Sequence, residues 1–580
     1  MMLDIVLDKL NGHAKDGKVC RIYISVGDTI NADDNICDIE SKKGSSTFKS
    51  NFSGVIKSIE ISEGDTISLG AVIAKIEGEA VGVKEDNKKE DNTSSNKGAS
   101  SFNYFAGLMK PKKEEISCDI AIVGGGPGGY VAAIEGAMLG ANVVLIEKEN
   151  LGGTCLNRGC IPTKTLVRSA EIYDSLCRAD EFGLIAENVS VNMKKIIQRK
   201  NNIVEELRNG IQFILEKRNV RIIKGEGKLV KEDSLFVKEN NTEITINAKN
   251  IILATGSKAM KLPILGADLE NVITSNEALD LDKLPKKLII IGGGIIGMEF
   301  AFMYSKLGVD VYVVEYFDSI LATLDKDICD EITAIAKDNN IKLYTGCKVE
   351  EILKGEDNQS IVVFSKEDTK KYLSADKVLM AVGRAPSIDT AELEKFNIEL
   401  TANKRAISVN DKMQTSLNNI YAIGDATNII QLAHVASHQG VVAARNIMGK
   451  ECSMNYDVVP SAIFTHPEIA VVGVSEKDAE KKGIEIEIGK FPFAANGKAM
   501  TYGEKEGFVK IIKDKATGVV IGGAIIGPHA TDLIAELALA VKNKLTAEQI
   551  TETIHAHPTT AEAIHEGALA LEGGSLHFVN

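Results

Sequence analysis

Two cysteines that could carry redox chemistry lie in the segment GGTCLNRGCIPTK (152–164), with four residues between Cys155 and Cys160. Such a pair could be a structural disulfide, half of a metal site, or a redox pair. A zinc half-site is normally matched by a second Cys or His pair, and no second pair of that kind occurs in the sequence. A structural disulfide does not suit a chain that is expected to work in the cytoplasm. The pair is therefore interpreted as redox active.

The same segment lies where a helix is expected to start after a glycine-rich turn. On an ideal helix, two positions five residues apart point about 140° away from each other. A disulfide between Cys155 and Cys160 therefore needs a distorted turn, and distortion makes such a bond easier to reduce. The helix N-terminus and Arg158 would favour the thiolate in the reduced form. The sequence thus predicts an easily reduced disulfide at a helix start.

A long internal repeat surrounds this pair. Residues 120–149 match residues 288–317, and each copy has an apolar run, a glycine-rich turn, a helix pattern, a second apolar run and an acid. The acid follows the first glycine at the same spacing in both copies. The glycines and acids are Gly124, Gly126, Gly129 and Glu147 in the first copy, and Gly292, Gly294, Gly297 and Glu315 in the second.

These positions match the chemistry of dinucleotide binding. The first glycine permits the tight turn, the second lets the backbone approach a pyrophosphate, and the third lets helix and strand pack closely. The helix N-terminus attracts the phosphates, and the acids Glu147 and Glu315 can accept hydrogen bonds from ribose hydroxyls. Glu315 would repel a 2′-phosphate, which favours NAD over NADP at the second site. The alternative is two ordinary glycine-rich turns in a parallel sheet.

Two dinucleotide sites and a cysteine pair in one chain predict an electron relay through one flavin, one nicotinamide and one disulfide. Side chains alone cannot carry a hydride, so the cofactors must do so. Cys155 and Cys160 follow the first glycine-rich loop closely. The first site is therefore expected to hold the flavin and the second to hold the nicotinamide.

A candidate acid–base group lies near the C-terminus, in IHAHPTTAEAIHE (554–566), which contains His555, His557, Glu562 and His565. Thiol–disulfide exchange needs a base whose pKa lies near the working pH, and histidine suits this role. A carboxylate that fixes the imidazole tautomer is the usual support. From the residues alone, histidines in a helix-rich tail are more often surface residues, and both interpretations stay open.

A smaller repeat precedes these elements. The tetrapeptide GDTI occurs at 27–30 and again at 64–67, each time after residues that alternate between apolar and polar. Two such half-units, each with one apolar face, can form a small flattened barrel or sandwich. Between them lies IESKKGSS (39–46), which places two lysines at an expected hairpin tip. The polar tract 79–101 that follows has no apolar period and is predicted to be a flexible linker.

Composition limits the possible partners. The net charge of −14 argues against nucleic acid or an anionic membrane as the main partner. The N-terminal residues show no signal pattern, and no apolar run is long enough to span a bilayer. The chain is therefore expected to be cytoplasmic, with no metal site.

From about residue 116 to 580 the chain resembles the pyridine nucleotide–disulfide oxidoreductase family, and within it the dihydrolipoamide dehydrogenases. The resemblance rests on GGTCLNRGC (152–160), ATGS (254–257), VGRAP (382–386) and AIGDAT (422–427), with Arg158 where valine is common. It implies that Asp425 contacts the flavin ribitol and that Lys164 pairs with Glu299 beside the flavin.

The resemblance also assigns the base and the thiol that take part in thiol–disulfide exchange. The pattern His-x-His-Pro-Thr-x-x-Glu makes His557 the base and Glu562 the carboxylate that orients it, with His555 structural. It makes Cys155 the thiol that exchanges with substrate. In the family the base comes from the partner subunit, which implies a homodimer.

The N-terminal repeat resembles a lipoyl or biotinyl carrier domain, whose modified lysine corresponds to Lys43. The usual lipoyl hairpin reads Asp-Lys-Ala, whereas this chain has Lys42-Lys43-Gly44, and the methionines that flank a biotinyl lysine are absent. The alternative is that both lysines only form a solvated turn. The resemblance implies covalent lipoate on Lys43.

The expected fold class is α/β, with two Rossmann-like dinucleotide-binding domains and an α+β interface domain after a small all-β lipoyl-type domain. The expected parts are a carrier domain (1–78), a linker (79–115), the first part of an FAD-binding domain (116–260), an NAD-binding domain (261–390), a central FAD-binding part (391–457) and a dimer-interface domain (458–580).

The expected function is oxidation of protein-bound dihydrolipoamide by NAD⁺ through FAD and the cysteine pair. The expected partner is the lipoylated acyltransferase core of a complex acting on a 2-oxo acid, acetoin or glycine. Alternatives are another NAD(P)H-dependent disulfide reductase, such as the glutathione, mercuric or thioredoxin enzymes, or a scaffold that uses the lipoyl-like domain for recruitment.

Overall fold

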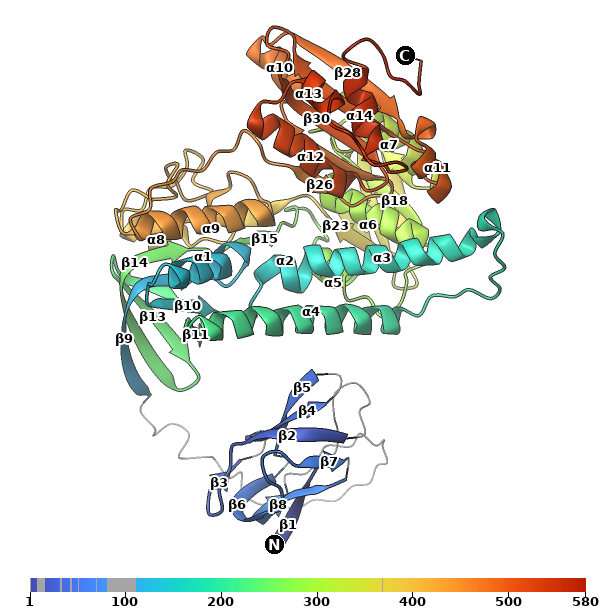
Figure 1. The fold of residues 1–580 in the computed structure, drawn as a ribbon. Helices are drawn as coiled ribbons and strands as arrows, with labels where there is room; N and C mark the ends of the chain where they lie inside the picture. The colour runs from blue at the N-terminus through green and yellow to red at the C-terminus, as the bar shows by residue number, and fades with distance from the viewer. Residues whose placement is uncertain are drawn as a thin grey trace. The chain divides into compact units, whose positions relative to one another are not determined.

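The computed structural model describes residues 2–7, 16–31, 34–41, 44–50, 52–68, 70–80, 111–367 and 369–579. These residues form two compact units, Met1–Tyr104 and Phe105–Asn580, each considered by itself (Figure 1). The lysine expected to carry lipoate, Lys43, lies outside the described residues. So does most of the expected linker, residues 81–110.

The first unit is a sandwich of two four-stranded antiparallel sheets, as the short repeat predicts. One sheet contains, in spatial order, β1 (Met2–Val6), β8 (Val72–Ala80), β6 (Phe52–Ile59) and β3 (Thr29–Ile30). The other contains β5 (Gly44–Lys49), β4 (Asn35–Ser41), β2 (Asp16–Ile22) and β7 (Thr66–Ser68). Buried isoleucines, such as Ile36, Ile56 and Ile73, fill the space between them.

The two half-units of this sandwich exchange equivalent hydrogen bonds. Gly27 N donates to Ile56 O at 2.9 Å, and Gly64 N donates to Val19 O at 2.8 Å. Both glycines have a left-handed φ, +100° and +99°, which glycine adopts without steric cost. The repeated GDTI turns therefore tie each half of the unit to the other.

The second unit begins with a seven-stranded sheet. Its centre is β9 (Lys112–Val123), which lies parallel to both β10 (Val143–Glu147) and β14 (Thr242–Leu253). The sheet is completed by β11 (Arg221–Lys224), β12 (Lys228–Lys231), β13 (Ser234–Glu239) and β25 (Ile420–Ala422). Strand β9 starts at Lys112 because residues 112–115 continue the pairing with β14, so the sheet extends into the segment expected to be linker.

The helices α1 (Pro127–Met138) and α9 (Ala433–Ile447) lie side by side against this sheet (Figure 1). Segments separated by some 300 residues therefore build one domain. The helices α3 (Cys160–Cys177) and α4 (Met193–Lys217) also lie side by side.

A second parallel sheet follows, made of β16 (Val272–Ile273), β23 (Lys377–Met380), β17 (Lys287–Ile291), β18 (Asp310–Val314) and β19 (Lys342–Tyr344). Helices α6 (Ile295–Lys306) and α7 (Lys326–Asp338) belong to it, and an antiparallel sheet of β20 (Lys348–Lys354), β21 (Ser360–Lys366) and β22 (Thr369–Ala375) adjoins it. Strands β15 (Ser257–Ala259) and β24 (Arg384–Pro386) pair where the chain enters and leaves this part. The two Rossmann-like domains are confirmed.

The C-terminal part is an antiparallel sheet in the order β26 (Ser461–Ile463), β27 (Glu468–Gly473), β30 (Val520–Gly527), β29 (Phe508–Asp514) and β28 (Ile486–Pro492). Helices α12 (Ala530–Asn543), α13 (Ala547–Thr551) and α14 (Glu562–Leu569) pack on it (Figure 1). Shorter helices are α5 (Ser275–Ala278), α8 (Thr390–Lys395), α10 (Glu476–Lys482) and α11 (Gly497–Tyr502). This part has the expected α+β character. In the part of the chain that the structure describes, no helix combines the length and apolarity needed to cross a bilayer.

A buried lysine joins the C-terminal sheet to the second Rossmann-like domain. The ammonium of Lys510, whose side chain is 0% exposed, lies 2.9 Å from Asp325 Oδ2, 2.8 Å from Asp327 Oδ1 and 2.7 Å from Glu476 Oε1. Burial alone would lower the pKa of Lys510, but the three carboxylates outweigh burial and raise it. These acids lie close enough to share one cation, and the ammonium occupies that place.

Replacing this lysine by methionine (Lys510→Met) is expected to lower the free energy of unfolding by about 3–5 kcal/mol, because it leaves the buried carboxylate of Asp325 without a counter-charge. Chemical denaturation followed by circular dichroism measures the change. The matched control is Lys515→Met, since the side chain of Lys515 is 57% exposed and the one ion pair it makes with a described residue is 3.9 Å long. Equal stability of the two variants would contradict the structural role of Lys510.

Candidate active site

One cavity of about 2440 Å³ runs through the second unit and contacts both glycine-rich loops and the cysteine pair. It is lined by most of the residues singled out from the sequence: Gly124, Gly126, Glu147, Cys155, Cys160, Lys164, Gly292, Gly294, Glu299, Glu315 and Asp425. The cysteines and both potential dinucleotide sites thus face one continuous space. This is the arrangement that an electron relay needs.

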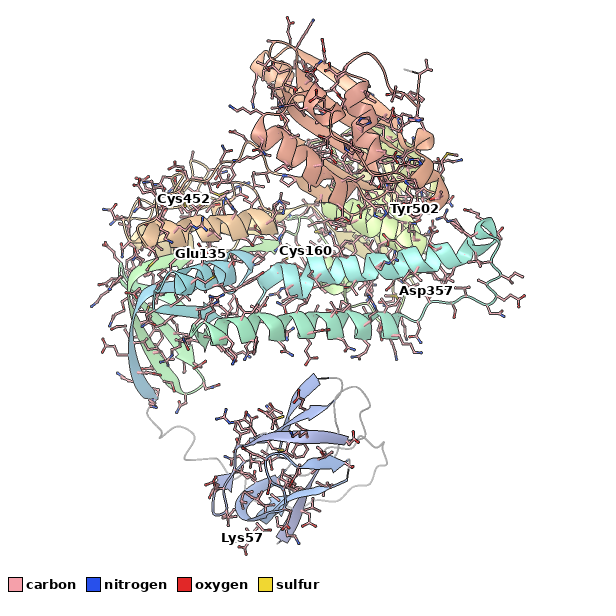
Figure 2. All side chains as sticks on the ribbon, viewed as in Figure 1. Lys57, Glu135, Cys160, Asp357, Cys452 and Tyr502 are labelled. Carbon is pink, nitrogen blue, oxygen red and sulfur yellow. The ribbon has the colours of Figure 1, made fainter. Side chains whose placement is uncertain are left out.

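The cysteines stand at a break between two helices. Helix α2 (Gly153–Arg158) carries Cys155, and α3 begins at Cys160, which Figure 2 labels at this junction. Gly159 separates the helices with φ −143° and ψ −115°, far from helical values. A Cβ at this position would lie 2.9 Å from Thr154 O, so a side chain does not fit there. The distorted turn predicted between the cysteines is therefore present, and glycine makes it possible.

In the first glycine-rich loop, two of the three glycines pack tightly against backbone atoms, and the middle one borders open space. A Cβ at Gly124 would lie 2.2 Å from Ala254 O, and a Cβ at Gly129 would lie 1.8 Å from Gly124 O. At Gly126, by contrast, the nearest atom would be 3.9 Å away. Gly126 is also the N-cap of α1 and makes no side-chain cap, so the free N–H groups of the helix start remain available to an anion.

The second loop repeats this geometry. A Cβ at Gly292 would lie 2.5 Å from Ala381 O, and a Cβ at Gly297 would lie 1.9 Å from Gly292 O. Around Gly294 no atom lies within 4 Å of the Cβ position. Each loop therefore packs tightly behind its middle glycine and leaves space in front of it.

The two acids that end the repeats occupy equivalent positions. Glu147 Oε2 accepts a hydrogen bond from Gly125 N at 2.7 Å, and Glu315 Oε2 accepts one from Gly293 N at 2.5 Å. Burial raises the pKa of Glu147. Each carboxylate is thus held against its own glycine-rich loop, beside the space that the middle glycine leaves.

The two thiols differ in acidity. A hydrogen bond from Cys155 lowers the pKa of Cys160 to about 7, against the opposing effect of burial, and the Lys164 ammonium lowers it further. The same hydrogen bond and burial raise the pKa of Cys155. When the pair is reduced, Cys160 is therefore the more acidic thiol, and Cys155 keeps its proton to higher pH. Both are free thiols in the structure.

The structure brings Lys164 and Glu299 together, as the resemblance implies. Lys164 Nζ lies 2.9 Å from each oxygen of Glu299, although the residues are 135 positions apart in the sequence. Lys164 comes from α3 and Glu299 from α6, where its side chain is only 7% exposed. This ion pair links the two Rossmann-like domains next to Cys160.

Arg384 is a further cation in the cavity wall, and the sequence motifs did not single it out. Arg384 Nε donates to Ser257 Oγ at 2.8 Å, and Ser257 Oγ donates to Asp425 Oδ2 at 2.5 Å. Arg384 Nη2 also donates to Ser257 O at 2.7 Å and lies 3.5 Å from Thr154 Oγ1. Ser257 lies in the motif ATGS and Arg384 in the motif VGRAP, so both positions belong to recognisable motifs. The distance between the motifs in the sequence does not reveal that the two side chains are in contact.

The histidine expected to act as base lies outside the cavity of its own chain. His557 Nδ1 lies 2.9 Å from Glu562 Oε1, and the His557 side chain is 80% exposed. Because an ionised carboxylate only accepts hydrogen bonds, Nδ1 carries the proton and Nε2 is left as a free acceptor. His555 instead contacts Glu536 Oε1 at 2.8 Å and Thr553 O. The structure pairs His557 with Glu562 but does not bring them to the cysteines.

Comparison with known families gives three matches. Residues 118–440 match the model described as pyridine nucleotide-disulphide oxidoreductase. Residues 459–568 match the dimerisation domain of the same family, and residues 12–76 match the model described as biotin-requiring enzyme.

Curated relatives and solved structures agree with these matches. A dihydrolipoyl dehydrogenase of Bacillus subtilis (strain 168) is 42% identical over 472 residues, which cover 79% of this chain and 99% of the relative. A dihydrolipoyl dehydrogenase of Chlamydia pneumoniae is 41% identical over 462 residues, 79% of this chain and 98% of the relative. The structure of LpdA from Mycobacterium tuberculosis superposes with a TM-score of 0.73 at 28% identity over 79% of this chain and 99% of that one. The flavoprotein disulfide reductase RclA from Escherichia coli gives a TM-score of 0.68 at 30% identity over 77% of this chain and 98% of RclA.

Proposed function

This chain belongs to the pyridine nucleotide–disulphide oxidoreductase family, and from that premise we propose that it oxidises protein-bound dihydrolipoamide with NAD⁺. The observation that supports this most strongly is the single cavity that joins two dinucleotide loops to the pair Cys155 and Cys160. The relatives from Bacillus subtilis and Chlamydia pneumoniae described above are named dihydrolipoyl dehydrogenases, which supports the same activity here.

The residues of the cavity fit FAD and NAD. The open space at Gly126 and Gly294 accommodates a pyrophosphate, whereas the closed backs of the loops would not admit a side chain. We assign FAD to the first loop, with Glu147 at its ribose, Asp425 and Lys164 at its flavin end and the half-buried cation Arg384 in the same space. We assign NAD to the second loop. When bound, FAD would supply the two-electron transfer between the cysteine pair and NAD⁺ that side chains alone cannot carry out.

The chain's own residues carry the sulfur chemistry. In the oxidised enzyme a substrate thiolate attacks Cys155 Sγ, the Cys155–Cys160 bond breaks, and Cys160 leaves as the thiolate that its lowered pKa favours. The second substrate thiol then displaces Cys155, which closes the lipoyl disulfide. His557 of the partner subunit takes the proton of the first substrate thiol and returns it to Cys155 as that sulfur leaves, and it then takes the proton of the second thiol, so one proton ends on Cys155 and one on His557. Two substrate thiols have then lost two electrons, and the cysteine pair has gained them.

We propose a homodimer in which each active site uses both chains. The match to the family's dimerisation domain supports the dimer, and the exposed position of His557 outside its own cavity supports a role in a neighbouring subunit. A two-fold dimer creates two such sites at once.

We further propose that the N-terminal domain carries lipoate on Lys43 and serves a multienzyme complex with a lipoylated acyltransferase core. The carrier-domain match supports this. Tethering would raise the local concentration of the lipoyl group to about the mM scale. Intact mass of the protein from its native source tests it, and absence of a lipoyl increment would refute it. A cytoplasmic location is proposed as well, because the seven cysteines outside the redox pair are unpaired, which suits a reducing compartment.

We expect purified protein to prefer NAD⁺ over NADP⁺ by at least about 100-fold in kcat/KM, because Glu315 sets a negative charge against a 2′-phosphate and such like-charge contacts cost several kcal/mol. The variant Glu315→Gln should narrow the preference by roughly tenfold. Steady-state rates with dihydrolipoamide and each nucleotide measure both.

The matched control is Glu356→Gln, which changes an exposed acid of the same domain that does not line the cavity. Its nucleotide preference should equal that of the unmodified protein. The same assay tests the function itself. A protein that binds flavin but does not reduce NAD⁺ with dihydrolipoamide is not a dihydrolipoyl dehydrogenase.

A further inference from the structure

The turn between β26 and β27 places one aromatic residue, Phe464, at the wall of the cavity. The two strands pair directly, with Ile463 opposite Ile469, which fixes both ends of the turn. Inside it, the buried hydroxyl of Thr465 donates to Pro467 O at 2.7 Å. The position of Phe464 is therefore set by the C-terminal domain and not by the helices that carry the redox residues.

Phe464 touches both members of the ion pair beside Cys160. Its backbone N–H donates to Glu299 Oε1 at 3.0 Å, and Lys164 Nζ lies over its ring, 4.1 Å from the centroid. A cation within about 6 Å of an aromatic face is attracted to it. Phe464 thus binds the Glu299 carboxylate through its backbone N–H and the Lys164 ammonium through its ring.

This contact limits where the Lys164 ammonium can go. The Lys164 side chain is 29% exposed, whereas its partner Glu299 is 7% exposed, so of the two only the lysine has room to move within the cavity that both line. The ring of Phe464 covers the ammonium on the side of the C-terminal domain. The ammonium therefore stays near Cys160, whose thiolate it stabilises.

We propose that Phe464 is a positioning residue of the redox centre, whose ring holds the Lys164 ammonium against the Cys160 thiolate. Phe464 lies within the dimerisation domain (459–568). That domain then acts on the cysteine pair of its own chain through Phe464, in addition to the base it presents to the other chain. The inference rests on the proposed redox role of Cys160.

The variant Phe464→Leu tests this, because leucine keeps the backbone N–H to Glu299 and the apolar bulk but removes the aromatic face. The reduced holoenzyme is alkylated with iodoacetamide at a series of pH values, and tryptic peptides are quantified by mass. Trypsin cleaves after Arg158, so Cys155 and Cys160 fall in separate peptides.

Cys160 of the unmodified protein should react with a midpoint near pH 7. In Phe464→Leu the midpoint should rise by roughly half a pH unit, and alkylation at about pH 6.5 should slow roughly threefold, in keeping with the modest strength of a partly exposed cation–π contact. The sign follows because a retreating cation destabilises the thiolate, which then forms only at higher pH.

Two further variants separate the ring face from general packing. Phe464→Tyr keeps the aromatic face and should restore the original midpoint. Phe508→Leu makes the same change in the same domain, at a phenylalanine that has Lys490 Nζ 4.9 Å from its ring centroid but does not line the cavity. It should leave Cys160 unchanged. A midpoint in Phe464→Leu equal to that of Phe508→Leu would overturn the proposal, as would an equal shift in Phe464→Tyr.

A double variant shows whether Lys164 carries the effect. In a Lys164→Met background, adding Phe464→Leu should shift the Cys160 midpoint no further, and a full additional shift would overturn the proposal. Flavin content and melting temperature of each variant report whether it folds. Turnover of dihydrolipoamide is measured separately, so a protein that lacks this activity but shows the Phe464-dependent shift refutes the proposed function and not the present inference.

Discussion

Serine in place of Cys155 (Cys155→Ser) is expected to lower kcat/KM for NAD⁺-dependent oxidation of dihydrolipoamide by at least about 10⁴-fold, the scale on which loss of a covalent nucleophile acts. A serine oxygen cannot form the sulfur–sulfur bond through which the substrate's electrons leave. Cys160 remains, but the sulfur of Cys155, which contacts it in the structure, is no longer there to form the disulfide. Production of NADH, followed by its absorbance, measures the loss.

The reaction of NADH with an artificial acceptor should survive this change, because it needs both dinucleotide loops but not the cysteine pair. The matched control is Cys177→Ser, which replaces an exposed cysteine at the other end of α3 and should change the rate by less than about twofold. If Cys155→Ser kept more than a hundredth of the original rate, the substrate would be oxidised by some other route. The scaffold alternative would then return.

The dinucleotide loops were predictable from sequence because their requirements are local. A left-handed φ of +109° at Gly124 and +108° at Gly292 needs glycine at one position. The first turn of the helix then fixes the spacing of the other glycines, and the lengths of helix α1 and strand β10 fix the spacing of the acid. Every part of this pattern lies within 30 consecutive residues. The same holds for Gly159, since a distorted turn between two cysteines needs a residue without a side chain.

Contacts between distant segments could not be derived from the residues. Lys164 and Glu299 were paired only through the resemblance to a family, because nothing local in α3 or α6 indicates that these helices meet. Arg384 and Phe464 were not singled out at all. Their roles depend on where the β15–β24 pair and the β26–β27 turn bring them, which is a property of domain packing.

The burial of Lys510 is another feature that the sequence of its own strand does not predict. In the strand FVKIIKD (508–514) Lys510 would be expected on the solvent side, with its neighbours Val509 and Ile511 facing inward. Instead, residues 509–512 are all buried, because the helices of the C-terminal domain cover one face of β29 and Asp325 and Asp327 meet the other. Alternation predicts one buried face, and this strand has two.

Replacing His557 by glutamine (His557→Gln) is expected to lower kcat for dihydrolipoamide oxidation by about 10²–10⁴-fold, the usual contribution of a general base. Partial burial raises the pKa of Glu562, but hydrogen bonds from Thr559 N and His557 outweigh burial and lower it. The carboxylate therefore stays ionised and keeps the imidazole in the tautomer whose Nε2 can take a proton. Glutamine fills a similar space and cannot take one.

A second histidine of the same tail offers a matched control. His577 Nδ1 lies 2.6 Å from Glu566 Oε1, and its side chain is 74% exposed, so it repeats the histidine–carboxylate pair of His557 in a different place. His577→Gln should therefore leave kcat within about twofold of the original value. If both variants lost activity equally, the effect would come from disturbing the tail and not from the loss of a base.

Mixing two inactive variants decides which chain supplies the base. When Cys155→Ser and His557→Gln chains are unfolded together and reassembled at equal concentrations, half of the dimers contain one chain of each kind. In such a dimer the site with the intact cysteines receives the intact His557 of the other chain, while the second site lacks both. About one quarter of the original activity should therefore return if the sites are shared across a two-fold axis. If each chain used its own histidine, no combination of the two would contain a complete site, and the mixture would remain as inactive as its parts.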